Sequence, residues 1–247
     1  MSERSTPGRL LSFSVHLFTA GGAVLGTFAL IAIASERLDA AALLMLAALF
    51  IDALDGTLAR AVRVSLHTPE IDGRRLDDIV DYLNFVIVPA VFLWGAGLVL
   101  HPGWLAAPVL ASAYGFSRRD AKTDDGFFLG FPSYWNILAL YLWLLGVGPL
   151  GGTLWLVGLS IAVFIPLKYL YPSQVQPMRL RFWLGVGGCL WTGLLIVCVV
   201  WPHATAPYFG VELSLLYPAW YMWLSFRRGG FHRNPAARTT ASENDEK

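Results

Sequence analysis

The chain has 247 residues, of which 56% are hydrophobic and only 14% are charged. Ordinary soluble domains are about 45–50% apolar and about 25% charged, so this composition argues against a soluble globular protein. Two cysteines are too few for a disulfide scaffold, and a formal net charge of +1 argues against a nucleic-acid-binding protein. A multi-pass membrane protein fits this composition.

Apolar segments recur along the chain at about the 20-residue length that a membrane-spanning helix needs. Pro108, in the short fourth segment, indicates a kink or a helix boundary. We therefore expect an all-α fold, a polytopic membrane helix bundle of about eight transmembrane helices. It forms one domain, 10–228, between polar tails at 1–9 and 229–247. In chain order the expected helices are 10–34, 39–60, 78–100, 104–116, 130–147, 154–171, 182–201 and 208–226.

The basic residues predict the orientation of these helices. With this arrangement, 17 of the 18 lysine and arginine residues fall in the tails and in the loops after the second, fourth and sixth helices. Arg37 is the exception. Because lysine and arginine are retained on the cytoplasmic side of a membrane, both termini and these three loops are expected to face the cytoplasm.

An acidic cluster interrupts the apolar pattern between residues 51 and 82. Asp52 and Asp55 lie inside the second apolar segment, where a carboxylate is costly and indicates a functional site. Asp77 and Asp81 are four residues apart at the start of the third segment, so they share one helix face. If the two helices are antiparallel neighbours, these two acidic faces meet at the cytoplasmic end.

Four facing carboxylates in a low-dielectric site require cations, and oxygen ligands favour Mg²⁺ or Mn²⁺. Gly56 and Ala59 share the helix face of Asp52 and leave space beside it, and Arg60 one residue further is suited to a phosphate. This combination predicts a site for metal ions and a diphosphate. The alternative is a set of interfacial salt bridges between the aspartates and Arg60, Arg63, Arg74 and Arg75.

Two sequence patterns in this region resemble a known family signature. They read Asp52-x-x-Asp55-Gly56-x-x-Ala59-Arg60 and Gly73-x-x-x-Asp77-x-x-x-Asp81. In this form they are similar to the signature of the CDP-alcohol phosphatidyltransferases. Twelve residues separate Arg60 from Gly73, which is longer than the usual form of that signature. The longer spacing, the stretch 120–136 and the expected number of spans resemble the bacterial branch of the family that uses choline.

This resemblance implies a specific reaction and specific residue roles. The enzyme would condense CDP-diacylglycerol with choline, releasing CMP, in the bacterial inner membrane with the active site facing the cytoplasm. Mn²⁺ or Mg²⁺, as two ions, would be held by the four aspartates, and Asp81 would also be the general base. The ligands and nucleotide-contacting residues so implied are Asp52, Asp55, Asp77 and Asp81 for the metals, and Gly56, Ala59, Arg60 and Gly73 for the nucleotide.

Residues for the acceptor alcohol are less strongly indicated. A quaternary ammonium ion is usually held by aromatic faces, and Tyr134 and Trp135 lie in the second family-like stretch. Arg119 and Lys122 in the same stretch are candidates for a phosphate. The alternative interpretations are an interfacial aromatic belt for the aromatic residues and topology for the basic residues. Gly22-x-x-x-Gly26 indicates close helix packing, either within the chain or in a homodimer.

Two other functions remain open from the sequence. The acceptor could be serine, inositol, glycerol phosphate or another alcohol, because the aspartate signature does not select it. Alternatively, intramembrane carboxylates could form the ion path of a divalent-metal or proton-coupled transporter. A transporter would more often place them near the membrane midplane on broken or repeated helices.

Overall fold

The computed structural model of the chain describes residues 6–123 and 125–231, and these are largely α-helical. The N-terminal half contains α1 (Thr6–Ala34), α2 (Leu38–Val62), α3 (Val64–His67), α4 (Gly73–Tyr82), the π-helix η1 (Leu83–Ile87), α5 (Val88–Gly95), the 3-10 helix η2 (Pro102–Leu105) and α6 (Ala106–Ser117). The C-terminal half contains β1 (Phe127–Leu129), α7 (Trp135–Leu144), α8 (Pro149–Ala162), β2 (Lys168–Leu170), α9 (Met178–Val200), α10 (Pro202–Thr205), η3 (Ala206–Tyr208), α11 (Gly210–Ser214) and α12 (Leu216–Arg228).

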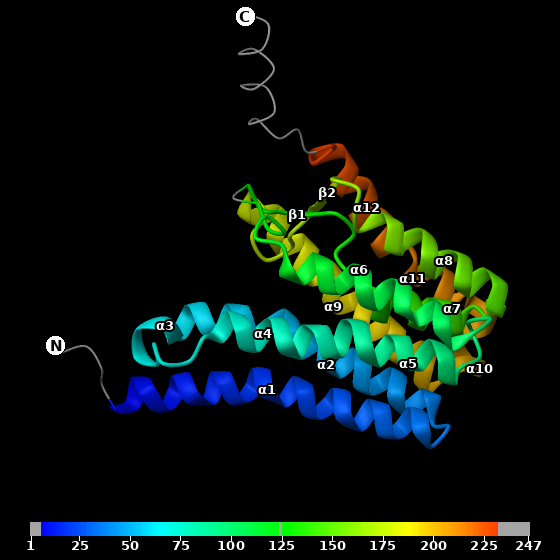
Figure 1. Cartoon of the computed structure of the whole chain (residues 1–247), viewed down its shortest axis with the longest axis horizontal. Helices are drawn as coiled ribbons and strands as arrows, with labels where there is room; N and C mark the ends of the chain where they lie inside the picture. Colours follow the sequence, from blue (N-terminus) through cyan, green and yellow to red (C-terminus); the bar gives the residue numbers. More distant parts are fainter. Residues whose placement is uncertain (1–5, 124, 232–247) are drawn as a thin grey trace, which may run out of the picture.

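The long helices form a bundle around a shared apolar core. Helix α1 packs along α2 and also contacts α4 and α5, while α9 contacts α2 and α11 (Figure 1). Three helices in the described part of the chain, α1 from Gly8 onward, α2 and α9, are long and apolar enough to cross a membrane, and α7 and α8 are shorter apolar helices. The expected all-α membrane bundle is therefore confirmed. The largest fully buried side chains are Trp135, Phe92, Met45, Leu46, Leu93, Leu140, Leu156, Leu170, Leu184 and Leu195.

Large apolar side chains are also exposed on the outer faces of the helices. Leu17 of α1 is 75% exposed, Leu154 of α8 is 64% exposed and Leu190 of α9 is 71% exposed. A water-soluble monomer rarely leaves so much apolar surface uncovered, whereas lipid chains cover it at no cost. This surface agrees with the membrane assignment.

Helix α4 begins five residues earlier than the start of the third expected helix. The Asp72 carboxylate accepts a hydrogen bond of 3.1 Å from the backbone N–H of Arg75, which caps the first turn. The helical run then continues through the π-turn η1 into α5. This wide turn ends at Ile87, two residues before Pro89, whose ring would clash with the preceding turn of an unbroken α-helix.

The fifth and sixth expected helices are shorter in the structure, because residues at their ends belong to a small sheet and its loops. Strand β1 pairs antiparallel with β2, with Phe128 opposite Tyr169, so 127–134 and 168–170 are not helical. Pro132 and Pro166 exclude helical hydrogen bonds at these positions. The fifth expected helix therefore starts at Trp135, and the sixth runs from Pro149 to Ala162 instead of 154–171. Pro108 lies in the first turn of α6, after a 3-10 turn, which is the boundary that it indicated.

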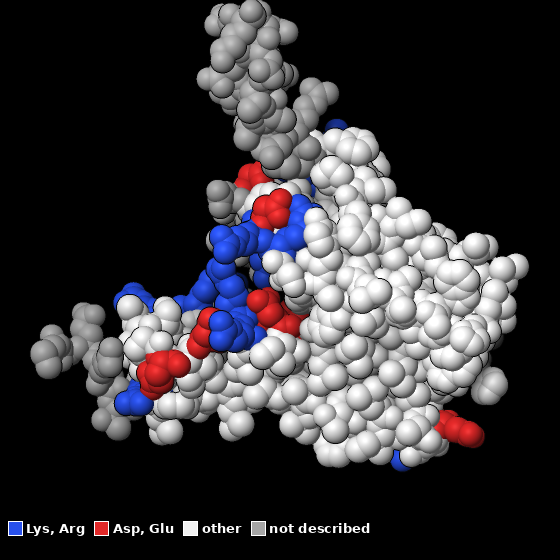
Figure 2. All heavy atoms as spheres, in the orientation of Figure 1, with Lys and Arg blue, Asp and Glu red and all other residues white. Residues whose placement is uncertain are grey.

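Charged side chains gather at one end of the bundle. Figure 2 shows the lysine, arginine, aspartate and glutamate residues around α3, the start of α4 and the two-stranded sheet of β1 and β2, whereas most of the remaining visible surface is uncharged. A small charged group lies at the opposite end, near the turn between α1 and α2. The surface is hollowed among the charged residues of the first group (Figure 2). We call this part of the molecule the charged end.

Candidate metal-binding site

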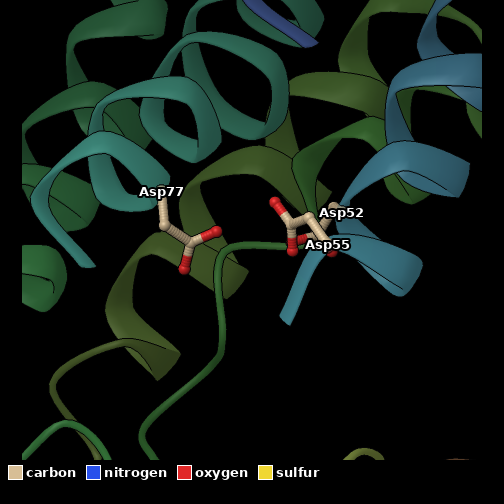
Figure 3. Close-up of side chains that lie close together, drawn as sticks. All are labelled: Asp52, Asp55 and Asp77. Carbon is tan, nitrogen blue, oxygen red and sulfur yellow. The ribbon is translucent and has the colours of Figure 1, made fainter. Parts of the chain in front are cut away.

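The aspartates of α2 and α4 meet near the charged end, as the sequence predicts. Carboxylate oxygens of Asp52, Asp55 and Asp77 all lie within 4.8 Å of one another. Asp52 and Asp55 extend from α2 and Asp77 from α4, and the carboxyl groups face a common space (Figure 3). Asp55 is 6% exposed.

Asp81 lies next to this group of three. Its side chain interacts with that of Asp52, while the side chain of Asp55 interacts with that of Asp77. Helix α2 runs toward the charged end and α4 runs away from it, so the aspartates form two layers. Asp55 and Asp77 make the outer layer, and Asp52 and Asp81 make the inner layer.

The donor set fits a hard divalent cation. Closely spaced carboxylates repel one another when they are ionised and buried, and a cation between them removes that repulsion. Oxygen-only ligands favour Mg²⁺, Mn²⁺ or Ca²⁺ over softer metals. The described salt bridges are Arg9–Glu70, Arg118–Asp120 and Lys168–Asp125, so none of them neutralises these aspartates. No salt bridge of the interfacial alternative is formed in the described part of the chain, although the charge of Arg60 acts on Asp55.

Thr19 of α1 is a site residue that the sequence did not reveal. Its side chain interacts with the carboxylate of Asp55. Thr19 is buried, with 7% of its surface exposed. A hydroxyl that fixes a carboxylate ligand orients it toward the metal. A threonine in a long apolar helix carries no spacing signal, because nothing in the sequence relates α1 to the aspartates.

The small residues of the signature have identifiable neighbours. A Cβ at Gly56 would lie 3.3 Å from Nη1 of Arg60, whose Nη2 donates to the Thr57 hydroxyl at 3.2 Å. The Arg60 guanidinium thus lies back over Gly56, on the same helix face as Ala59. A Cβ at Gly73 would lie 3.3 Å from Cε1 of His16. The position of Gly73 is therefore restricted by packing as well as by any nucleotide contact.

The imidazole of His16 is held by a hydroxyl group of the loop region. Its Nε2 forms a hydrogen bond of 3.0 Å with the Thr68 hydroxyl, which also lies 3.1 Å from the carbonyl oxygen of Val64. His16 therefore connects α1 to the loop before Gly73.

The loop after α6 forms a polar cleft of about 510 Å³ at the charged end. Lys168 bonds Asp125 at 2.6 Å, and this hydrogen bond holds the pKa of the Asp125 carboxyl below its ordinary value. Arg119 makes no ion pair in the described part of the chain, and the charge of Lys122 acts on Asp52, Asp77 and Asp81. The cleft is lined by Arg119, Asp120, Lys122, Thr123, Asp125, Leu129 and Lys168.

Tyr134 and Trp135 differ in their relation to the site. Tyr134 is close enough to Asp52 for its hydroxyl to interact with the carboxylate charge. Trp135 is 1% exposed, and its indole N–H donates to the Ser112 hydroxyl at 2.7 Å. Trp135 therefore packs in the core and fixes the start of α7, whereas Tyr134 lies within electrostatic range of Asp52.

Comparison with known proteins identifies the family. Residues 15–166, well over half of the chain, match the family model described as CDP-alcohol phosphatidyltransferase. The chain belongs to this family. It is accordingly a membrane-embedded transferase that acts on CDP-diacylglycerol and an alcohol, and divalent-metal use is a property of the family.

Bacterial relatives match most of the chain. A phosphatidylcholine synthase of Legionella pneumophila is 38% identical over 244 residues, covering 94% of this chain and 93% of its own. A phosphatidylcholine synthase of Bradyrhizobium diazoefficiens is 37% identical over 224 residues, covering 88% and 80%. One of Borreliella burgdorferi is 36% identical over 173 residues, covering 69% and 74%. These similarities extend beyond the segment that matches the family model.

Proposed function

We propose that the protein condenses CDP-diacylglycerol with choline to give phosphatidylcholine and CMP. The observation that carries this proposal is the two-layered aspartate cluster near the charged end, within a chain similar over most of its length to phosphatidylcholine synthases. The donor has two acyl chains and a soluble nucleotide, so a site at the membrane surface can reach both parts.

The aspartates supply the metal site and the general base. Asp52, Asp55 and Asp77, with Asp81 beside them, would hold Mn²⁺ or Mg²⁺, in two ions. Such ions neutralise the charge that develops on the phosphoryl oxygens and on the leaving group. The choline hydroxyl forms the new bond to the phosphorus attached to diacylglycerol, and the bond from that phosphorus to the CMP oxygen breaks. Asp81 accepts the hydroxyl proton.

The basic residues would hold the donor diphosphate. Arg60 extends from the outer side of the aspartates, where Gly56, Ala59 and Gly73 leave room for the nucleotide. Arg119 and Lys122 face the cleft next to the cluster, so they are placed to bind phosphate oxygens by charge-assisted hydrogen bonds. CMP then leaves toward the side on which the charged residues lie.

The distribution of charge supports a proposed location. The charged end would face the cytoplasm of a bacterial inner membrane, because basic residues are retained on that side. The single domain 10–228 would lie between two tails, although α1 already begins at Thr6 and most of the second tail, 232–247, lies outside the described residues. A homodimer, also expected, would need a surface other than Gly22 and Gly26, since these contact η1 of the same chain.

An acceptor panel tests the proposed reaction. Purified protein would receive CDP-diacylglycerol, Mn²⁺ or Mg²⁺, and choline, serine, inositol or glycerol phosphate in separate assays. We expect CMP release with choline, accompanied by labelled phosphatidylcholine, and none after removal of the metal. Release with serine or inositol but not with choline would overturn the choice of acceptor. An absence of release with every alcohol, together with metal flux in vesicles, would overturn the proposal as a whole.

A further inference from the structure

The rings of Phe131, Tyr134, Tyr169 and Tyr221 form an aromatic wall, and Tyr134 in this wall lies within electrostatic range of Asp52 in the inner layer of aspartates. The ring of Tyr134 packs edge-on against Tyr221 of α12 at a centroid distance of 6.2 Å, and against Phe131 at 6.4 Å. Phe131 in turn packs against Tyr169 of β2 at 6.3 Å. Phe131, Tyr169 and Tyr221 are less than 10% exposed, so they form a fixed backing for Tyr134.

The hydroxyl groups of Tyr134 and Tyr221 differ in their hydrogen bonds. Tyr221 donates to the carbonyl of Leu170 at 2.7 Å, so its oxygen can only accept from Tyr134. That contact is 3.5 Å long, which is beyond the usual range for an O–H···O hydrogen bond. Tyr134 therefore has no strong hydrogen-bond partner in the described part of the chain, although its hydroxyl feels the charge of Asp52.

The direction of the reaction places the acceptor on this side. Phosphoryl transfer requires the attacking and leaving oxygens to lie roughly in line on opposite sides of the phosphorus. The small residues and Arg60 lie beyond the outer layer, so CMP leaves there and the alcohol approaches from the inner layer. Asp81, the general base, and Asp52, the neighbour of Tyr134, make up that inner layer.

We infer that Tyr134 is the specificity-determining residue of the acceptor site, presenting its ring to the quaternary ammonium group of the alcohol, and that Tyr221 positions that ring. This inference rests on the proposed function. A methylated ammonium ion binds an aromatic face through cation–π attraction and needs no hydrogen-bond acceptor. Arg119 and Lys122, which none of the described salt bridges neutralises, repel the same cation in their cleft, whereas the aromatic wall carries no positive charge.

Kinetics of two Tyr134 variants test the inference. Tyr134→Leu should raise the KM for choline about tenfold and leave the KM for CDP-diacylglycerol within about twofold, since a desolvated cation–π contact contributes about that factor. Tyr134→Phe retains the ring and should restore most of the choline affinity. Choline should lose its advantage over ethanolamine in Tyr134→Leu. Tyr208→Leu, at a tyrosine of η3 that is 76% exposed, is the matched control.

Several outcomes would overturn the inference. An unchanged KM for choline in Tyr134→Leu would remove Tyr134 from the acceptor site. Equal increases in both KM values, or no rescue by Tyr134→Phe, would indicate a structural role instead. These outcomes are distinct from failure of the proposed function, in which the unaltered enzyme would release no CMP with choline.

Discussion

Asp81 and Asp78 lie three residues apart on α4 but have different surroundings. Asp81 is paired with Asp52 in the inner layer, whereas Asp78 lines a groove with Ile79 and Tyr82 that is separate from the aspartate cluster. Three other carboxylates form the close group, so the metal and the donor retain their main ligands when Asp81 is altered. A comparison of variants at these two positions therefore distinguishes a loss of proton transfer from the general effect of removing one negative charge.

We expect Asp81→Asn to lower CMP release by at least about 100-fold, because a positioned general base contributes about 10²–10⁴-fold. Metal-dependent binding of CDP-diacylglycerol should be largely retained, as measured by equilibrium binding of labelled donor. Asp78→Asn should keep most of its activity. Full activity in Asp81→Asn would rule out the general-base role.

Thr19→Val removes the hydroxyl that orients Asp55 while keeping a side chain of the same shape. Loss of such an outer hydrogen bond to a metal ligand typically weakens metal affinity or activity by about 10–100-fold. A Mn²⁺ titration of the initial rate would measure the change in metal requirement. Thr27→Val is the matched control, since Thr27 is exposed on the same helix and bonds only the carbonyl of Ala23 among the described residues. An unchanged Mn²⁺ requirement in Thr19→Val would contradict the assigned role.

At the scale of elements, a pair of glycines on α1 accommodates the π-turn that follows Asp81. Asn84 of η1 donates to the carbonyl of Gly22 at 2.9 Å. A Cβ at Gly22 would lie 2.8 Å from Cγ1 of Val80, and a Cβ at Gly26 would clash with the side-chain oxygen Oδ1 of Asn84. The Gly-x-x-x-Gly stripe thus holds the wide turn against α1 within the chain.

Gly26→Ala should therefore destabilise the protein, because Asn84 and the turn after Asp81 have to move. Overpacking of this kind costs about 1–3 kcal/mol, which thermal unfolding in detergent would detect, and CMP release should fall as well. Gly158→Ala on α8 is the control, since a Cβ there meets no atom within 4 Å. Its unfolding temperature should stay the same or rise. A Gly26→Ala protein as stable and active as the parent would contradict this account of the stripe.

Regular spacing decided which elements could be predicted from the sequence. The helical positions of Asp52, Asp55, Asp77 and Asp81 follow from intervals of three and four residues, and the structure brings these side chains together. The three-residue strands of the small sheet lie within apolar runs and carry no periodicity of their own. Thr19, which comes from a third helix, is defined by tertiary packing alone.

At the scale of the whole molecule, the concentration of charge at one end defines an orientation that can be measured. Ser35 lies in the turn between α1 and α2, and Gln174 lies between β2 and α9, and both are exposed. In a variant without Cys189 and Cys198, Ser35→Cys should react with a membrane-impermeant maleimide on intact spheroplasts. Gln174→Cys should react only after the membrane is opened. The reverse labelling pattern would show that the charged end faces the outside of the cell. Labelling of both cysteine variants on intact spheroplasts would show that the protein does not have a single orientation.

The two aspartate layers come from the antiparallel helices α2 and α4, so the geometry of the site depends on how these two helices align in the bundle. A slide of α4 along α2 by one helical turn, about 5.4 Å, would separate both pairs at once. A divalent ion that binds all of these carboxylates would therefore stabilise one register of the two helices over every other, by mass action. Within a bilayer, contacts between apolar helix faces favour one register over another only weakly, because lipid chains are as apolar as the side chains that they replace. The ion that serves the reaction would then also be the ligand that selects how the helices align.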